Sequence, residues 1–258
     1  MNTLLLEDAG SIRTITMNRP ERRNALNPAM QEELIAAFET APAAGTRIII
    51  LQGAGEAFCA GLDLSVLETM KDKTAEEFRT DAARTARMFS AIWQCDIPTI
   101  AKVHRAAIAG GSGLAMLCDF TIASTEAVFG FSEARIGFVP ALVGAYLPLL
   151  VGEKIALEML ISARRYGALE ALRCGLVNEV VEPDQLTTRV NELAQDLLGN
   201  SSQSLTATKR LLRENTEARL RPALALAAEA NAAARETEDF REGITSFFEK
   251  RKPRWANE

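Results

Sequence analysis

Two small-residue turns hold the groups best suited to chemistry in this chain. The first covers residues 58–63 (FCAGLD) and the second covers residues 109–113 (AGGSG). Each turn follows an apolar, β-branched run and precedes a helical pattern, and glycine lets a backbone approach a ligand closely. The start of a helix leaves its first N–H groups without intrahelical acceptors. Two such turns converging on one point would polarise a carbonyl oxygen, as an oxyanion hole does.

A single carboxylate accompanies these turns. Glu133 is expected at the edge of an apolar strand, between Phe131 and Phe138. Apolar neighbours withdraw a carboxylate from water and raise its pKa toward the range useful for proton transfer. The combination predicts an enzyme that stabilises a negatively charged oxygen and moves a proton. Taken without the motif around it, Glu133 is better explained as a surface carboxylate or an ion-pair partner of Arg135.

The elements that must position these groups indicate an α/β core. Apolar or alternating runs predict strands at residues 12–17, 47–53, 97–103, 120–123, 127–130 and 176–181. Helices are expected from the Asn27-Pro28 cap to about residue 39, within residues 71–92, and over 142–151 and 153–162 on either side of Gly152. The order strand, strand, helix favours units stacked as a spiral, and no GxGxxG motif follows the first strand to indicate a Rossmann sheet.

The chain changes character after about residue 200. Residues 201–214 and 222–248 are predicted to be helical, and residues 223–234 are rich in alanine. Alanine and leucine at helical spacing make a narrow packing face. Such a face belongs either to an ordinary core helix or to an oligomer contact, and the position of these helices in one terminal block favours the contact.

Composition excludes several classes of protein. The 258 residues are 48% hydrophobic and 24% charged, as expected for one large domain or a domain with an appendage. A net charge of −5 disfavours nucleic-acid binding, and no apolar run is long enough for a membrane span. Two basic clusters, residues 19–23 and 250–254, are either solvated surface or a site for a nucleotide phosphate.

The cysteines and the lone histidine bear on location and metal binding. Four widely spaced cysteines in apolar contexts favour reduced thiols, and the first residues lack the features of a secretion signal, so a cytoplasmic location is expected. The cysteines are Cys59, Cys95, Cys118 and Cys174. The chain has no Cys or His cluster with metal-ligand spacing and His104 is its one histidine, so no metal site is expected.

Four motifs in order, together with the ending, resemble the signatures of the crotonase, or enoyl-CoA hydratase/isomerase, superfamily. The motifs are residues 18–26, 58–64, 109–119 and 129–140, and the ending is residues 247–253. The resemblance covers essentially the whole chain. It implies a crotonase-like α/β fold: a spiral of ββα units with the acyl-CoA site in residues 1–200, and a helical trimerisation region in residues 201–258. It also implies a homotrimer or a dimer of trimers.

The resemblance also implies roles for particular residues. The backbone N–H groups of Leu62 and Gly110 would form the oxyanion hole, and Glu133 would be the catalytic carboxylate. Coenzyme A would lie against one set of residues from this chain and against two that reach in from a neighbouring subunit. The first set is Arg23, Ala25, Ala60, Asp63 and Leu64, and the second is Phe247 and Lys250. No separate cofactor is implied, because coenzyme A is part of the acyl-CoA substrate, and no nucleic acid or membrane partner is implied.

The chain departs from the two-glutamate hydratases of this superfamily at Gly113, where those proteins carry the other glutamate. Three functions therefore stay open. Glu133 hydrates an enoyl-CoA alone or with a carboxylate from residues 66–81; or it shuttles a proton between C2 and C4 of a 3-enoyl-CoA as an isomerase; or the protein binds acyl-CoA with little activity. Hydration leads, because residues 131–140 resemble bacterial proteins of the hydratase branch.

Overall fold

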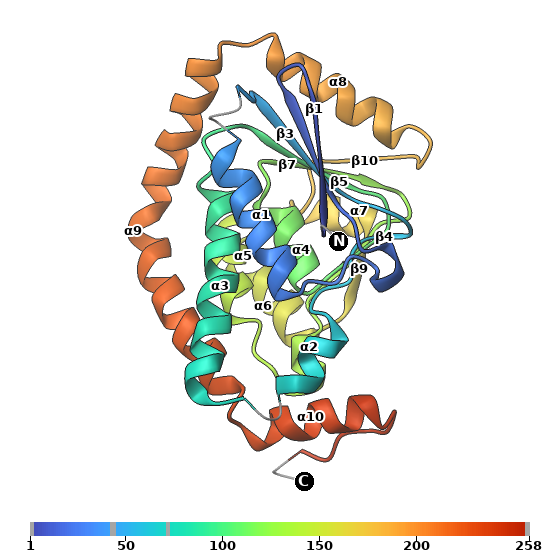
Figure 1. The fold of residues 1–258 in the computed structure, drawn as a ribbon, viewed down its shortest axis with the longest axis vertical. Helices are drawn as coiled ribbons and strands as arrows, with labels where there is room; N and C mark the ends of the chain where they lie inside the picture. The colour runs from blue at the N-terminus through green and yellow to red at the C-terminus, as the bar shows by residue number, and fades with distance from the viewer. Residues whose placement is uncertain (1–2, 42–44, 71–72, 256–258) are drawn as a thin grey trace.

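The computed structural model describes residues 3–41, 45–70 and 73–255. In this part of the chain, the strands form two sheets, and helices flank them (Figure 1). The larger sheet has the order β1-β2-β3-β5-β7-β10, and all its neighbours are parallel except β1 and β2. Its strands are β1 (Leu4–Ala9), β2 (Ile12–Met17), β3 (Ile48–Gly53), β5 (Thr99–Val103), β7 (Phe120–Ser124) and β10 (Glu179–Val181).

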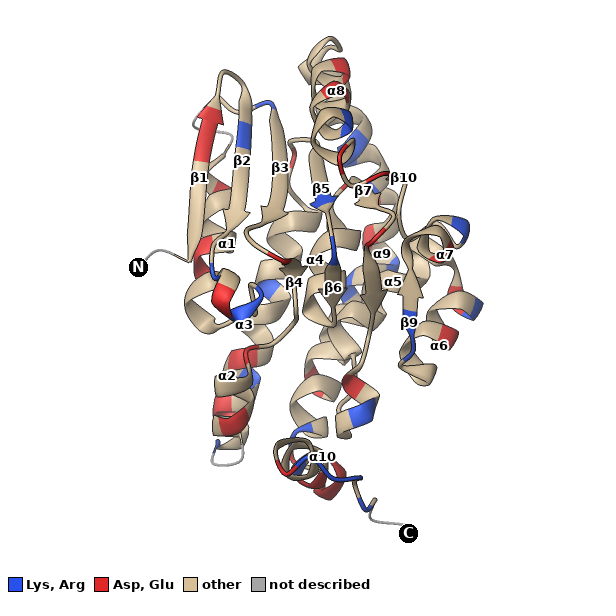
Figure 2. Ribbon diagram, turned by 90° about the vertical axis from the view of Figure 1, so that its right-hand side faces the viewer, with Lys and Arg blue, Asp and Glu red and all other residues tan. Residues whose placement is uncertain are grey.

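The smaller sheet has the order β4-β6-β8-β9, and only β9 runs antiparallel to its neighbour. Its strands are β4 (Ala57–Cys59), β6 (Ala106–Ile108), β8 (Val128–Gly130) and β9 (Arg165–Gly167). Figure 2 shows the strands of the larger sheet above those of the smaller one. The chain repeats one pattern, in which a strand of the larger sheet is followed by a strand of the smaller sheet and then by a helix. The pairs are β3 and β4, β5 and β6, and β7 and β8. This repetition confirms the predicted spiral of ββα units.

Helices fill the intervals between the strands and enclose the sheets. They are α1 (Pro28–Thr40), α2 (Leu64–Thr69), α3 (Ala75–Trp93), α4 (Gly110–Leu117), α5 (Ala141–Val151), α6 (Glu153–Ser162), α7 (Ala168–Arg173), α8 (Leu186–Leu198), α9 (Ser202–Ala234) and α10 (Glu238–Phe248). Two short 3₁₀ helices are η1 (Pro20–Arg22) and η4 (Glu133–Ile136). The side chain of Asn27 accepts a hydrogen bond from the N–H of Met30, which confirms the predicted cap of α1.

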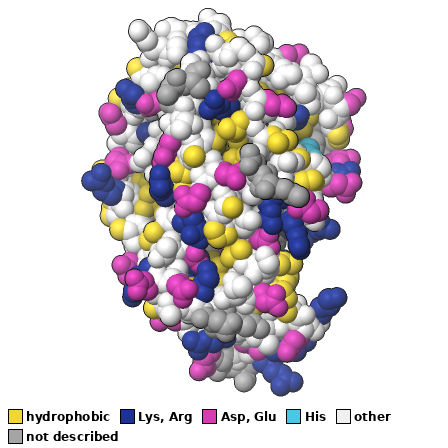
Figure 3. Space-filling view, in the orientation of Figure 1, with side chains coloured by type: hydrophobic (Ala, Val, Ile, Leu, Met, Phe, Trp, Pro, Cys, Tyr) yellow, Lys and Arg dark blue, Asp and Glu magenta, His cyan; other side chains and the backbone are white. Residues whose placement is uncertain are grey.

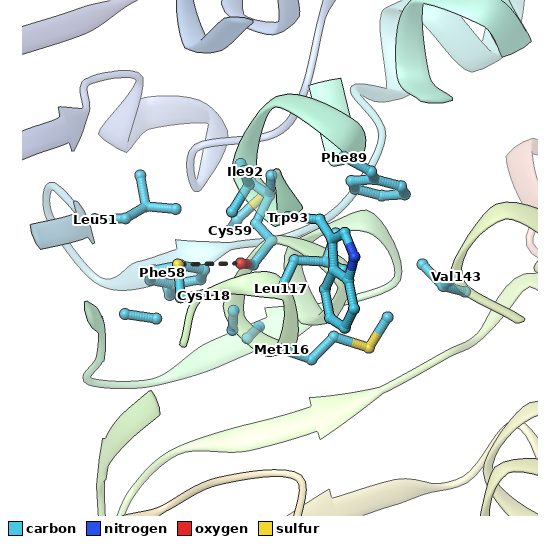
Figure 4. Packing of buried hydrophobic residues seen from close by; sticks show 14 of the residues in the cluster. Leu51, Phe58, Cys59, Phe89, Ile92, Trp93, Met116, Leu117, Cys118 and Val143 are labelled. Carbon is cyan, nitrogen blue, oxygen red and sulfur yellow. Dashed lines mark hydrogen bonds between the residues drawn. The ribbon is translucent and has the colours of Figure 1, made fainter. Parts of the chain in front are cut away.

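The core surrounds α4, whose residues from Gly111 to Leu117 are all buried. Figure 4 shows Phe89 and Trp93 of α3, Leu117 of α4 and Val143 of α5 among the apolar side chains packed here. Burial of these side chains stabilises the region that holds the second small-residue turn. Charged residues of both signs are interspersed on the face drawn in Figure 3, where apolar side chains gather toward the middle.

The C-terminal prediction was wrong about where the helices divide. Residues 202–234 form one continuous helix through Pro222, and the break falls just before Thr237, whose side chain caps α10. Proline cannot donate to the carbonyl of residue 218, four positions earlier. Both Pro222 and Ala218 are exposed, so water can satisfy that carbonyl and the helix persists. Figure 1 shows α9 running along one side of the molecule from α8 to α10.

Two other predicted boundaries differ from the structure. The strand expected at 176–181 is confined to β10, because the N–H groups of Leu176 and Val177 both donate to the carbonyl of Ala171 and close α7. The helical stretch expected within 71–92 begins at Ala75, after a capping box between Thr74 and Glu77. Residues 71 and 72 lie outside the described residues.

Candidate active site

The second small-residue turn presents the N-terminus of α4. Ala109 precedes the helix with φ 51°, a conformation that is strained for a residue with a Cβ, and its N–H donates to the carbonyl of Gly130 at 2.7 Å. Gly110 is the first residue of α4, so its N–H has no intrahelical acceptor. The hydrogen bond from Ala109 to Gly130 holds the turn and so fixes the direction in which the N–H of Gly110 points.

The first turn leaves the amide of Leu62 outside its short ladder. Leu26 donates to the carbonyl of Gly61 at 2.7 Å, and Asp63 donates to the carbonyl of Leu26 at 2.9 Å. In a parallel bridge of this kind the middle residue, Leu62, directs its own N–H away from the partner strand. Gly61 has φ 93°, which glycine adopts without strain.

The two turns pack backbone to backbone. A Cβ on Gly61 would lie 2.9 Å from the carbonyl oxygen of Ile108, and a Cβ on Gly111 would lie 2.2 Å from that of Cys59. No ordinary side chain tolerates these separations, so glycine is required at both positions. The structure therefore brings together the two turns that the sequence singled out, with Leu62 and Gly110 on the wall of one cavity.

This cavity has a volume of about 730 Å³, within the range of small-molecule sites. It lies between the two turns, η4, α3, α9 and α10. Most of the residues expected to contact coenzyme A line it: Arg23, Ala25, Ala60, Asp63, Leu64 and Phe247. Phe247 does so from the same chain. Lys250 is not among the lining residues; it follows α10, is exposed, and donates its N–H to the carbonyl of Phe247 at 3.2 Å.

Glu133 contributes the carboxylate of this cavity from η4. The sequence placed it at a strand edge, but β8 ends at Gly130 and Glu133 begins the 3₁₀ helix that follows. Its Oε2 is buried and has no hydrogen-bond partner among the described residues, and no ion pair joins it to Arg135 there. Burial raises the pKa of Glu133 to about 7, although its own backbone N–H opposes the shift. The side chain is thus poised to exchange a proton near neutral pH.

The position expected to hold a further glutamate is occupied by apolar side chains. A Cβ on Gly113 would lie 2.8 Å from Cζ of Phe89 and 3.0 Å from Cγ1 of Val143. No acidic residue of the described part of 66–81 lines the cavity, and Asp81 is bonded instead to Lys73 and Arg84. Apart from Glu133, the acidic residues on the described wall are Glu21 and Asp63.

The carboxylate of Asp63 is engaged in holding the first turn in place. One oxygen accepts hydrogen bonds from the N–H and the hydroxyl of Ser65, so Asp63 is the N-cap of α2. The other oxygen lies 2.6 Å from Nη2 of Arg19. Hydrogen bonds from Ser65 and the charge of Arg19 keep the pKa of Asp63 below its ordinary value, although burial acts in the opposite direction as the largest single influence. Asp63 therefore stays ionised and fixes the loop that carries Leu62.

Other residues singled out by sequence serve the fold. Ser112 donates to the carbonyl of Ala107 and accepts from the N–H of Gly130, and Nε2 of His104 lies 3.0 Å from the carbonyl oxygen of Gly55. Trp93 and Tyr146 pack together in the core, with ring centroids 5.3 Å apart.

Sequence patterns did not indicate several polar residues that line the cavity. They are Gln31 of α1, Thr85 of α3, and Asn231 and Arg235 at the C-terminal end of α9, three segments that lie far apart in the chain. Spacing along the helices could not distinguish them from solvent-facing positions.

Comparison with known proteins places this geometry in a family. The family model for enoyl-CoA hydratase/isomerase matches residues 7–258. A Thermus thermophilus protein is 41% identical over 96% of this chain and 98% of its own length. The "Short-chain-enoyl-CoA hydratase" of Clostridium acetobutylicum is 35% identical over 98% of this chain and 97% of its own.

Solved structures give the same result. The crystal structure of an enoyl-CoA hydratase/isomerase from Xanthobacter autotrophicus Py2 superposes with a TM-score of 0.87 and 32% identity, covering 96% of each chain. The fold is therefore that of the crotonase class. The chain belongs to the enoyl-CoA hydratase/isomerase family, as its motifs indicated. Among the described residues, no helix has both the length and the apolar character needed to cross a membrane.

Proposed function

We propose that this protein adds water to the 2,3 double bond of enoyl-CoA thioesters, with Glu133 as its single acid–base group. The observation that carries the proposal is the buried, unpartnered Oε2 of Glu133 in a cavity that Leu62 and Gly110 also line. The name of the Clostridium relative supports hydration over other reactions of the family.

The reaction balances with one carboxylate. Glu133 as the carboxylate takes a proton from water while the water oxygen bonds to C3 of the substrate. The electron pair of the double bond moves toward the thioester carbonyl and gives an enolate. Glu133 then returns the same proton to C2, which yields the 3-hydroxyacyl-CoA and restores the carboxylate. Both proton transfers use a group whose pKa of about 7 suits either direction.

The amides of Leu62 and Gly110 would stabilise the enolate oxygen. Each is a backbone donor held by neighbouring structure, Gly110 through the bond from Ala109 to Gly130 and Leu62 through its bridge with Leu26. Preorganised donors of this kind contribute roughly 3–4 kcal/mol each to the stabilisation of a transition state. Coenzyme A enters as part of the substrate, and the proposed mechanism uses no separate cofactor.

Coenzyme A would lie at the mouth of the cavity, near the basic residues Arg22 and Arg23 and the exposed apolar side chains of Leu64 and Phe247. We further propose a homotrimer, or a dimer of trimers, built through α9. Its exposed Leu211, Leu212 and Leu226 support this assembly, because large apolar side chains at the surface commonly mark contacts. Lys250 would reach the coenzyme A of a neighbouring subunit.

A second candidate is the isomerisation of a 3-enoyl-CoA to a 2-enoyl-CoA. Phe89 and Val143 favour it, because they remove a polar anchor for a reacting water from the wall beside Gly113. Glu133 alone can move a proton from C2 to C4, and this reaction consumes no water.

Product analysis tests the proposal. The purified protein is supplied with trans-2-butenoyl-CoA and, separately, with trans-3-hexenoyl-CoA, and the thioesters are separated by chromatography. Formation of 3-hydroxybutanoyl-CoA is the expected result. Conversion of the 3-enoyl ester alone would establish the isomerase instead. Tight binding without any product would contradict both reactions and leave an acyl-CoA-binding protein.

A further inference from the structure

Two polar residues at the C-terminal end of α9 line the cavity, and each has side-chain polar atoms without a hydrogen-bond partner in the described structure. Asn231 and Arg235 stand one helical turn apart and are only 5% and 6% exposed. Residues four apart share one face of a helix, so both belong to the same part of the wall. Buried polar groups ordinarily have hydrogen-bond partners, and a buried guanidinium is rare without an anion.

Arg235 is held in place, but two of its three side-chain nitrogen atoms have no hydrogen-bond partner in the described structure. Its Cζ lies 5.3 Å from the ring centroid of Phe138 and 5.7 Å from that of Phe78. Its Nε and Nη1 have no hydrogen-bond acceptor among the described residues. Nη1 is 3.8 Å from Oδ2 of Asp81, which gives attraction but no hydrogen bond. Burial lowers the pKa of Arg235 to about 10, so the guanidinium stays charged at neutral pH.

Asp81 cannot neutralise this site, because its two oxygens are already engaged. Oδ2 pairs with Lys73 and Oδ1 pairs with Arg84. Among the described residues, Asp81 therefore hydrogen-bonds to Lys73 and Arg84 but not to Arg235. Figure 1 shows that α3, which carries Asp81 and Arg84, and α9, which ends just before Arg235, run side by side. A buried guanidinium that has no hydrogen-bonded carboxylate and lies beside a cavity attracts an anionic ligand group.

Asn231 can complete such a site. Its Oδ1 is buried and has no donor within the described structure, so the amide is not committed to a protein partner. An asparagine amide also carries two N–H donors, which can turn toward a ligand oxygen. Arginine with an amide one turn away matches the two oxygens of a carboxylate.

We propose that Arg235 and Asn231 bind a carboxylate at the far end of the acyl group. The substrates would then be 2-enoyl-CoA thioesters of dicarboxylic acids. This inference rests on the proposed function for its reaction, but the site itself depends only on the binding of the acyl end. Phe138, whose ring centroid lies 5.3 Å from Cζ of Arg235, and Phe89 also line this cavity.

The test compares matched thioesters. Trans-2-enoyl-CoA esters of about five to eight carbons are assayed beside esters of equal length that end in a carboxylate instead of a methyl group. For the best length, we expect the carboxylated ester to have a kcat/KM at least about tenfold higher. Arg235→Met should lower this ratio of kcat/KM values by about tenfold or more.

A matched control removes a neighbouring cation. Arg241 shares a small pocket with Arg235 but does not line the main cavity, so Arg241→Met should change the ratio by less than about threefold. Asn231→Leu provides a second variant that keeps the charge of Arg235, and it should also lower the ratio. Using a ratio within each variant removes differences in the amount of folded protein.

The outcomes separate this inference from the proposed function. Two outcomes would overturn the carboxylate site and leave the proposed hydration intact. One is hydration of methyl-terminated esters with no preference for the carboxylated ones. The other is a ratio of kcat/KM values that is unchanged in both Arg235→Met and Asn231→Leu. If no ester is hydrated, calorimetric binding of hexanedioyl-CoA against hexanoyl-CoA still decides the matter. Tighter binding of the dicarboxylic ester, lost in Arg235→Met, supports the site, and equal binding refutes it.

Discussion

The ring of Phe89 fills the space that any side chain at position 113 would need. A Cβ on Gly113 would come within 2.8 Å of Cζ of Phe89, and Val143 closes the same space from α5 at 3.0 Å. The missing glutamate is therefore not a simple truncation that leaves a hole. The neighbouring core has packed against glycine, so Glu133, the acid–base group that we propose, has no second carboxylate from position 113.

This packing makes Gly113→Ala destabilising. Overpacking a well-filled core typically lowers the free energy of unfolding by about 1–3 kcal/mol. The gain in helix propensity from alanine, about 1 kcal/mol, offsets part of that loss. Chemical denaturation of the variant and the parent protein measures the difference. Gly167→Ala is the control, because a Cβ there meets nothing within 4 Å. An equal effect of the two substitutions would show that Phe89 does not restrict position 113.

The pH dependence of activity follows from the raised pKa of Glu133. The reaction needs the carboxylate to take a proton from water, so kcat/KM should rise with pH and level off above about pH 7. Below that value it should fall by about tenfold for each pH unit, because the protonated fraction grows. A pH–rate profile with trans-2-butenoyl-CoA measures this. A profile flat down to about pH 5, near the ordinary pKa of a glutamate, would contradict the account.

Gly111→Ala tests whether the two turns must touch. A Cβ at this position would lie 2.2 Å from the carbonyl oxygen of Cys59, a backbone atom in a buried strand. The substitution must push α4 away from the first turn and so separate the amides of Gly110 and Leu62. Loss of one oxyanion donor lowers kcat by about 100-fold to 1,000-fold, and we expect an effect of that size.

The control for this variant is Gly144→Ala on α5. Its added Cβ would make an ordinary contact, 3.4 Å from Cδ1 of Leu160. Circular dichroism reports whether each variant is folded. A folded Gly111→Ala protein with the kcat of the parent would remove the oxyanion role from these turns.

Much of the fold and of the site could be predicted from sequence, because the signals were local. The cap at Asn27, the division between α5 and α6 at Gly152 and the alternation of strands depend on residues near one another in the chain. The turns around Leu62 and Gly110 were recognisable for the same reason. Their glycines are dictated by backbone contacts that only small residues permit.

The parts that could not be predicted depend on contacts across the fold. The role of Phe89 beside Gly113 arises where α3 crosses α4, and the buried charge of Arg235 arises where α9 meets α3. Continuity of α9 through Pro222 could not be predicted either, because it depends on the exposure of Pro222 and Ala218, where water can satisfy the carbonyl that proline leaves without a donor. The sequence singled out Glu133 as a candidate site residue. It did not predict the 3₁₀ helix that carries Glu133, because four residues show too little periodicity.

Helix α10 holds the segment that carries Glu133 through a close backbone contact. A Cβ on Gly243 of α10 would lie 2.2 Å from the carbonyl oxygen of Ile136, the last residue of η4. Gly243→Ala should therefore displace α10 or η4 and lower kcat by at least about tenfold, since small misplacements of catalytic groups have large effects. Steady-state assays of the folded variant measure this. Unchanged kcat would mean that α10 does not position Glu133.

The most direct test of the central claim is the activity of Glu133→Gln on trans-2-butenoyl-CoA. Glutamine keeps the size of the side chain but cannot accept the proton from water. We predict that kcat falls by at least about 1,000-fold, a loss within the range of roughly 100-fold to 10,000-fold that general acid–base catalysis contributes. Affinity for the 3-hydroxyacyl-CoA product, measured by calorimetry, should stay within about threefold of the parent. A kcat within tenfold of the parent would contradict the assignment of Glu133 as the single acid–base group.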